Sequence, residues 1–185
     1  MSKTVGILAL QGGFEAHAKI LRGLDAQARE VRTKDDLEGL DALIIPGGES
    51  TVMTLGIERE GLAEPLRALI RDGLPTLGTC AGMIMLDRDH LGLLDVKAER
   101  NAFGRQSHSF ETDLELLGDA RPLHAVFIRA PWVSEHAPGV EVLARVGEHP
   151  VAVRQGNVLA VAFHPELAGD TRLHEMLLSP NGGEP

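Results

Sequence analysis

The chain has 185 residues, 43% of them hydrophobic, and therefore fits one domain that buries about 70% of the surface its unfolded form exposes. With 18 Lys and Arg against 27 Asp and Glu, the net charge is −9, which argues against nucleic acid and anionic membranes as partners. A single cysteine excludes an internal disulfide. Since the N-terminus shows no basic leader and no long apolar span, we expect a cytoplasmic protein.

No metal or other cofactor is expected. Two acidic clusters, over residues 34–38 and 87–89, have no His or Cys at ligand spacing and are interpreted as solvated faces or helix starts.

The first half of the chain alternates between strand and helix patterns. Residues 4–10 are almost continuously apolar, as in a strand buried on both faces of a parallel sheet. Apolar residues at helical spacing follow, and then a second strand. The pattern continues to residue 86 with strands over 28–31, 40–45 and 74–77 and helices over 14–24, 61–72 and 81–86. This alternation predicts one three-layer α/β domain with a mostly parallel sheet.

Three loops fall at the carboxyl edge of that sheet, where such folds bind ligands. They contain Gln11, the pair Gly47 and Gly48, and Cys80. Adjacent glycines leave the peptide between them free to aim an N–H at a ligand oxygen. The alternative for this loop is a plain turn.

Cys80 stands at a strand-to-helix junction in the pattern G-x-C-x-G. Small residues two positions before and after a nucleophile allow the sharp turn of a nucleophile elbow, and a helix N-terminus favours the thiolate. We expect this cysteine to be exposed at the elbow and to act as a nucleophile. The alternative is a buried structural cysteine, since free cysteine is among the most buried residue types.

The second half has β-type segments near 110–114, 125–130 and 141–146, and then a hairpin. Strands over 151–155 and 158–163 flank Gly156-Asn157, a two-residue turn signal. The second strand leads to His164-Pro165-Glu166, where Pro165 keeps His164 extended and lets His164 and Glu166 project to the same side. Residues 171–178 form a closing helix, so the domain spans 1–178 and 179–185 is a flexible tail.

A thiol nucleophile needs an imidazole to take and return its proton, and the imidazole needs an acceptor on its other nitrogen. Cys80, His164 and Glu166 supply these groups in that order. Among the eight histidines, His149 is the alternative base. With the turn at 156–157 it would lie directly across the hairpin from His164, but it has no carboxylate fixed two residues beyond it.

Several segments together resemble the class I, triad-type glutamine amidotransferases, and among them the glutaminase subunits of pyridoxal 5′-phosphate synthase. They are residues 10–12 (LQG), 46–51 (PGGEST), 78–82 (GTCAG), 99–101 (ERN) with 103–106 (FGRQ), 127–131 (FIRAP) and 163–167 (FHPEL). The resemblance covers essentially the whole chain. It implies a Rossmann-like, flavodoxin-like sandwich with Cys80, His164 and Glu166 as its triad.

The resemblance also implies the substrate and the partner. The family hydrolyses L-glutamine to L-glutamate and ammonia, which passes to a separate synthase subunit in a large hetero-oligomer that builds pyridoxal 5′-phosphate. The amides of Gly48 and Ala81 are expected to form the oxyanion hole. The residues that match the family's glutamine site are Gly47, Gly48, Glu49, Arg100, Ile128 and Arg129.

Two other functions compete with this one. The first is the glutaminase of another amidotransferase, such as imidazole glycerol phosphate synthase, which would differ in the segments around Arg100 and Ile128-Arg129. The second is a DJ-1-like redox or chaperone protein, which has an elbow cysteine but no need of His164-Pro165-Glu166.

Overall fold

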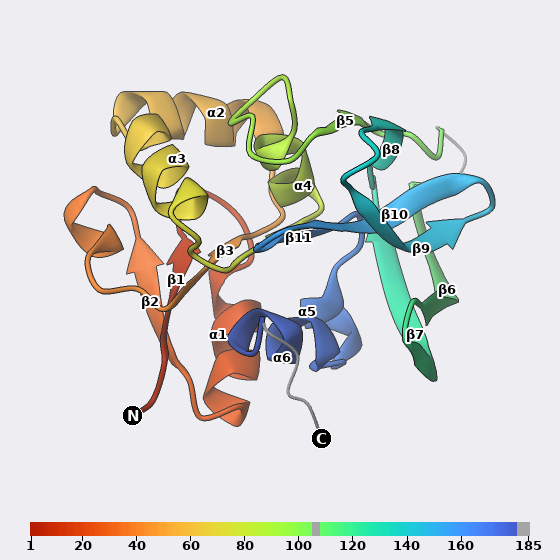
Figure 1. Cartoon of the computed structure of the whole chain (residues 1–185), viewed down its shortest axis with the longest axis horizontal. Helices are drawn as coiled ribbons and strands as arrows, with labels where there is room; N and C mark the ends of the chain where they lie inside the picture. Colours follow the sequence, from red (N-terminus) through yellow and green to blue (C-terminus); the bar gives the residue numbers. More distant parts are fainter. Residues whose placement is uncertain (105–107, 181–185) are drawn as a thin grey trace.

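The structure, a computed structural model, describes residues 1–104 and 108–180. Within these residues a seven-stranded sheet forms the centre, in the order β2-β1-β3-β4-β11-β10-β9 (Figure 1). Its strands are β1 (Thr4–Leu8), β2 (Gln27–Val31), β3 (Ala42–Ile45), β4 (Thr76–Thr79), β9 (Glu141–Val146), β10 (His149–Gln155) and β11 (Val158–Val161). The strands from β2 to β11 in this order are parallel, and β10 is antiparallel to both of its neighbours. The predicted mostly parallel sheet and C-terminal hairpin are confirmed.

Helices cover both faces of the sheet and complete the predicted three layers (Figure 1). On one face lie α1 (Phe14–Gly23), α5 (Pro165–Ala168) and α6 (Arg172–Leu178). On the other lie α2 (Ser50–Arg59), α3 (Ala63–Arg71) and α4 (Ala81–Leu86), and a short 3-10 turn η1 (Asp35–Leu37) follows β2. Strands β3, β4 and β11 are buried at every position, which explains why apolar and polar residues do not alternate along them.

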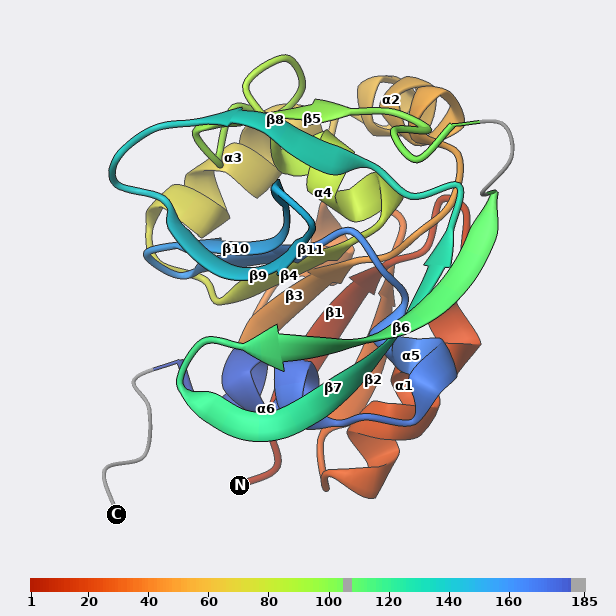
Figure 2. The ribbon, with the colours of Figure 1, turned by 90° about the vertical axis from the view of Figure 1, so that its right-hand side faces the viewer.

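Two antiparallel pairs extend the molecule beyond the main sheet, on opposite sides of β9 and β10 (Figure 2). One joins β5 (Val96–Glu99) to β8 (Trp132–His136), and the other joins β6 (Ser109–Leu116) to β7 (Asp119–Ile128). Phe127 of β7 stacks on Phe110 with ring centroids 4.6 Å apart and also packs 5.5 Å from Phe163. These aromatic contacts hold β7 beside the end of β11, where His164 follows.

The sequence suggested that the acidic cluster at 87–89 is a solvated face or a helix start, and this is correct only for Arg88 and Asp89, which are exposed. Asp87 is only 1% exposed, and its carboxylate accepts hydrogen bonds from the backbone N–H groups of Asp89 and Ala98 and contacts His90 Nδ1 at 2.8 Å. Asp87 therefore organises the loop between α4 and β5. Of the predicted tail, residues 181–185 lie outside the described part of the chain.

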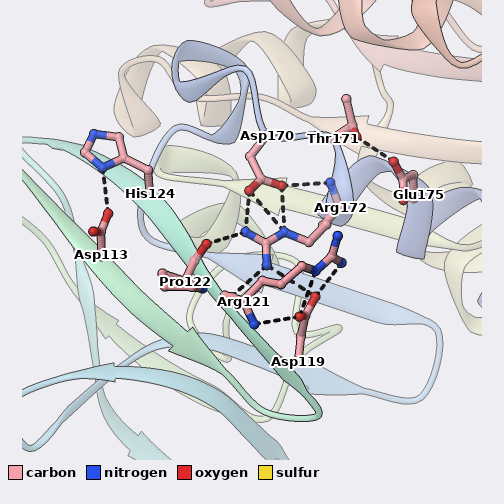
Figure 3. Close-up of polar contacts among 9 residues, drawn as sticks. All are labelled: Asp113, Asp119, Arg121, Pro122, His124, Asp170, Thr171, Arg172 and Glu175. Atoms are coloured by element: carbon pink, nitrogen blue, oxygen red, sulfur yellow. Dashed lines mark hydrogen bonds and ion pairs between the residues drawn. The ribbon is translucent and has the colours of Figure 1, made fainter.

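Arg172, at the start of α6, fastens the β7 ribbon to the segment that follows α5 (Figure 3). Its guanidinium donates to Asp170 through Nε at 3.0 Å and through Nη2 at 2.5 Å. It also donates to Asp119 at 3.2 Å and to the backbone oxygens of Arg121 and Pro122 at 2.9 and 2.7 Å. Hydrogen bonds from Arg121, and to a smaller extent from Arg172, lower the pKa of Asp119. The planar fork of an arginine suits this role, because it satisfies several acceptors at once.

Arg172→Gln is expected to lower the melting temperature by about 5 °C, because glutamine leaves several of these acceptors without a donor. The matched control is Arg121→Gln, which also removes a partner of Asp119 but at a side chain that is 74% exposed. Exposed pairs contribute little, so the control should change the melting temperature by only about 1 °C. The melting temperatures are measured by circular dichroism. Equal shifts in the two variants would contradict the role of Arg172 in joining β7 to the segment after α5.

Candidate active site

Cys80 occupies the sharp turn between β4 and α4, as the sequence predicted. Its φ of 53° and ψ of −109° are strained for a residue with a side chain, and such strain is concentrated at functional sites. The flanking glycines are required by close packing: a Cβ on Gly78 would lie 2.8 Å from the carbonyl carbon of Gly82, and a Cβ on Gly82 would lie 1.9 Å from the Ile45 oxygen.

The expectation that Cys80 is exposed is wrong, because only 7% of the residue is accessible. The last residue of β7 covers the elbow, with the carbonyl oxygen of Ile128 3.7 Å from Sγ. Cys80 nevertheless lines a cavity of about 400 Å³ at the carboxyl edge of the sheet. It is thus a buried cysteine that faces a cavity, which combines features of both alternatives considered above.

The cavity brings together most of the predicted site residues. Its lining residues are Gly48, Glu49, Ser50, Cys80, Ala81, Ile84, Arg100, Asn101, Ile128, Arg129 and His164. Gly47 and Glu166 lie behind this surface rather than on it. The sequence did not single out Ser50, Ile84 or Asn101. Asn101 and Arg129 both have positive φ, at 47° and 45°, so two strained turns meet at the cavity wall.

His164 and Glu166 form a pair, as predicted, with Nδ1 of the ring 2.6 Å from Oε1 of the carboxylate. The backbone N–H of His164 donates to the Val126 oxygen of β7, and Pro165 begins α5. Burial opposes protonation of the ring, but interactions with Cys80 and Glu166 outweigh it and raise the pKa of His164 to about 10. Although burial has the opposite effect, the hydrogen bond from His164 keeps the pKa of Glu166 below its ordinary value.

His149 does not lie across the hairpin from His164, so that expectation is wrong. The β10–β11 ladder ends at the pair Ala152 and Val161, because the backbone then leaves the sheet and His164 bonds to β7 instead. His149 pairs with Val146 in β9 and stacks on Trp132, with ring centroids 3.6 Å apart and planes at 2°. It is not among the residues that line the cavity.

The glycine loop packs directly on the cysteine and histidine. A Cβ on Gly47 would lie 2.6 Å from His164 Cε1 and 3.5 Å from Cys80 Cβ. A Cβ on Gly12 would lie 1.7 Å from the Gly47 oxygen, so this carbonyl is directed at Gly12. Since the peptide between Gly47 and Gly48 is trans, the Gly48 N–H points away from Gly12. The side chain of Gln11 fixes the next peptide by accepting from the Glu49 N–H at 2.7 Å.

Glu49 and Arg100 meet at the cavity mouth, with Oε1 and Nη2 2.9 Å apart. The other carboxylate oxygen of Glu49 caps α2 by accepting from the Val52 N–H at 2.9 Å. This hydrogen bond, together with the charge of Arg100, lowers the pKa of Glu49. Both predicted residues are thus at the site, already paired with each other.

A mostly parallel α/β sandwich with an elbow cysteine and a histidine–glutamate pair at one cavity defines the class I glutamine amidotransferases, as the resemblance implied. Within that class the chain belongs to the SNO glutamine amidotransferase family, whose model matches residues 7–180.

Individual relatives agree with this family. "Pyridoxal 5′-phosphate synthase subunit PdxT" of Mycolicibacterium vanbaalenii is 52% identical over 95% of this chain and 96% of its own length. The protein of the same name from Pelotomaculum thermopropionicum is 52% identical over 94% of this chain and 93% of its own. A solved structure described as a crystal structure of glutamine amidotransferase is 50% identical, with a TM-score of 0.91 over 96% of this chain and 98% of its own.

Proposed function

We propose that this chain is the glutaminase subunit of a pyridoxal 5′-phosphate synthase: it hydrolyses L-glutamine to L-glutamate and ammonia for a separate synthase subunit. The observation that carries the proposal is the cavity in which an elbow Cys80 meets the 2.6 Å pair of His164 and Glu166. Membership in the SNO family and the PdxT relatives support the choice of substrate and pathway.

In the proposed reaction the Cys80 sulfur attacks the side-chain amide carbon of glutamine while His164 holds the thiol proton. The imidazolium then gives this proton to the leaving nitrogen, and ammonia departs from a γ-glutamyl thioester. Water attacks the thioester, His164 takes a proton from it, and glutamate leaves as Cys80 is regenerated. Glu166 accepts from Nδ1 throughout and fixes the tautomer of the ring.

The oxyanion of each tetrahedral intermediate needs donors beside the sulfur. We assign this role to the backbone N–H groups of Gly48 and Ala81, both of which line the cavity. Loss of one such donor typically costs about 3 kcal/mol of transition-state stabilisation. The Gly48 donor depends on the orientation of the Gly47–Gly48 peptide.

The cavity mouth suits an amino acid that carries both charges. Opening the 2.9 Å pair of Glu49 and Arg100 would present an anion to the α-ammonium group of glutamine and a cation to its α-carboxylate. Ile128 and Arg129 also line this cavity. Gly47 contributes by its small size, since any side chain there would displace His164.

The partner and the location are part of the same proposal. The partner is the synthase subunit in a large hetero-oligomer, for which the name of the PdxT relatives is the support. The glutaminase unit spans residues 1–178, with a tail over 179–185. No helix in the described part of the chain is long and apolar enough to cross a membrane. An unpaired cysteine suits the reducing cytoplasm.

We expect the isolated chain to bind glutamine but to turn it over slowly, and the synthase subunit to raise kcat about a hundredfold. A Gly-Gly peptide has two accessible orientations, and only the one that presents the Gly48 N–H to the oxyanion is productive. A partner that binds near Gln11 and Glu49 needs only a few kcal/mol of differential binding to select it.

The measurement is ammonia release from glutamine by the purified chain, with and without the co-purified synthase subunit of the same organism. The expected result is a larger change in kcat than in KM. Full activity of the chain alone, unchanged by the synthase, would exclude activation by the partner. Absence of ammonia release in both conditions would exclude the proposed function.

A further inference from the structure

Two buried histidines stand behind Glu166, on the side away from the cavity. His17 of α1 and His174 of α6 are both 0% exposed, with His17 Nδ1 2.9 Å from His174 Nε2. The other nitrogen of His17, Nε2, lies 3.6 Å from Glu166 Oε2 and 3.5 Å from Thr79 Oγ1. A continuous series of side-chain contacts therefore leads from the cavity into the core, through His164, Glu166, His17 and His174.

Glu166 Oε2 is a buried carboxylate oxygen without a hydrogen-bond partner in the described residues. Such a group is costly unless a donor serves it, and the nitrogen that faces it is His17 Nε2. Their 3.6 Å separation exceeds a hydrogen bond, but contacts at an unliganded site commonly tighten when substrate binds.

The contact between the two histidines selects one tautomer. If His17 carried its proton on Nδ1, the bare Nε2 would face Glu166 Oε2, and His174 Nδ1 would be a buried N–H without a partner. In the other arrangement, His174 donates from Nε2 to His17 Nδ1, and His17 donates from Nε2 toward Glu166. His174 Nδ1 is then a lone pair rather than an orphaned N–H. This second tautomer satisfies the carboxylate.

Both rings are neutral in this arrangement. Burial lowers the pKa of His17, and burial together with the nearby His17 lowers the pKa of His174 to about 4. The other titratable groups that face this series are Cys80 on the cavity side, next to His164, and Asp170 on the side of His174. His17 therefore acts on Glu166 as a neutral donor and not as a second cation.

From this geometry we infer that His17 is a positioning residue for the proposed glutaminase: its Nε2–H, oriented by His174, holds Glu166 so that Oε1 faces His164. The inference rests on the proposed function for the reaction, and on the contacts above for the role. A carboxylate with two oxygens in a buried site can rotate about its last bond. A donor on Oε2 fixes that rotation and leaves Oε1 for the imidazole.

The test compares substitutions at one position. His17→Leu removes the donor and keeps an apolar side chain of similar size. In His17→Gln the amide nitrogen falls near the position of Nε2 and restores the donor, whereas in His17→Asn it falls near Nδ1 and does not reach Glu166. His136→Gln is the matched control, because His136 is an exposed histidine on β8 whose ring bonds, among the described residues, only the neighbouring Ala137 oxygen.

We expect His17→Leu and His17→Asn, each assembled with the synthase subunit, to lower kcat ten- to a hundredfold with little change in KM. His17→Gln should recover most of the loss, and His136→Gln should match the unsubstituted chain. A donor to the ionised carboxylate lowers its pKa, so losing that donor raises the pKa of Glu166 and moves the acidic limb of the kcat profile to higher pH. A merely structural role would not give this shift together with its reversal in His17→Gln.

The low-field proton resonance of His164 Nδ1–H provides a readout that needs no turnover. It should broaden or move in His17→Leu and His17→Asn and remain in His17→Gln. If His17→Leu does not fold, the comparison of His17→Asn with His17→Gln tests the inference. Kinetics and resonance unchanged in His17→Asn would exclude the inference while leaving the proposed function intact. Failure of the unsubstituted complex to release ammonia would instead exclude the function, and the resonance would still test the contact.

Discussion

Replacing Cys80 with alanine or serine is expected to lower glutamine hydrolysis by a factor on the order of 10⁴ or more, because no other group in the cavity can form the thioester. The fold should remain intact, although the residue is buried. Its Sγ faces the cavity and touches the Ile128 oxygen, so removal leaves the core cluster unchanged. Melting temperatures within about 3 °C of the unsubstituted chain are expected.

A diazoketone analogue of glutamine provides an independent measurement. It should label Cys80, the single cysteine of the chain, in the folded protein, and mass spectrometry should find no label after denaturation or in Cys80→Ala. Met83→Leu is the control, because Met83 is a buried residue of α4 that does not line the cavity. Turnover retained in Cys80→Ser or Cys80→Ala would exclude the covalent mechanism.

The main sheet, the Gly47-Gly48 loop and the elbow at Cys80 were predictable because local sequence patterns determine them. Apolar runs such as residues 42–45 and 158–161 are buried at every position, and the Gly156-Asn157 turn is the hairpin the sequence indicated. The reason for glycine at position 47 was only partly foreseen. Close contact with His164 requires it there, since the backbone of Gly47 does not adopt a positive φ.

The pairing of β5 to β8 and the position of β7 were not predictable from such patterns. β7 determines two features of the site: it accepts the His164 N–H and it leads to the Ile128 oxygen that covers Cys80. Both contacts join residues far apart in the chain. This is why the sequence predicted an exposed elbow and placed His149 opposite His164, whereas the structure shows neither.

The two histidines behind Glu166 left only a weak signal. His17 completes an apolar helical stripe with Phe14, Ala18 and Leu21, which indicates burial on the inner face of α1. A buried histidine needs a partner, but that partner, His174, is 157 positions away. Spacing along one helix therefore reveals that His17 is buried and cannot reveal what it bonds.

His164→Asn should lower kcat by about 10⁵, because no other base among the described residues that line the cavity can hold the proton of Cys80 and return it to the leaving ammonia. The loss of kcat in Glu166→Gln should be smaller than the loss in His164→Asn by a factor of about ten to a hundred. In subtilisin-like triads the acid contributes less than the nucleophile and base, since it orients the ring and stabilises its charge rather than moving a proton. Single-turnover ammonia release with the synthase subunit bound would measure both.

His149→Asn is the matched control for that pair, because it makes the same substitution at a histidine stacked on Trp132 outside the cavity. We expect its kcat to match that of the unsubstituted chain. A larger loss in His149→Asn than in His164→Asn would reverse the assignment of the base. The pH dependence gives a second criterion: the interactions that raise the pKa of His164 to about 10 include Glu166, so Glu166→Gln should lower that pKa and move the alkaline limb of kcat to lower pH. If the limb did not move, Glu166 would not be the group that holds the proton on His164.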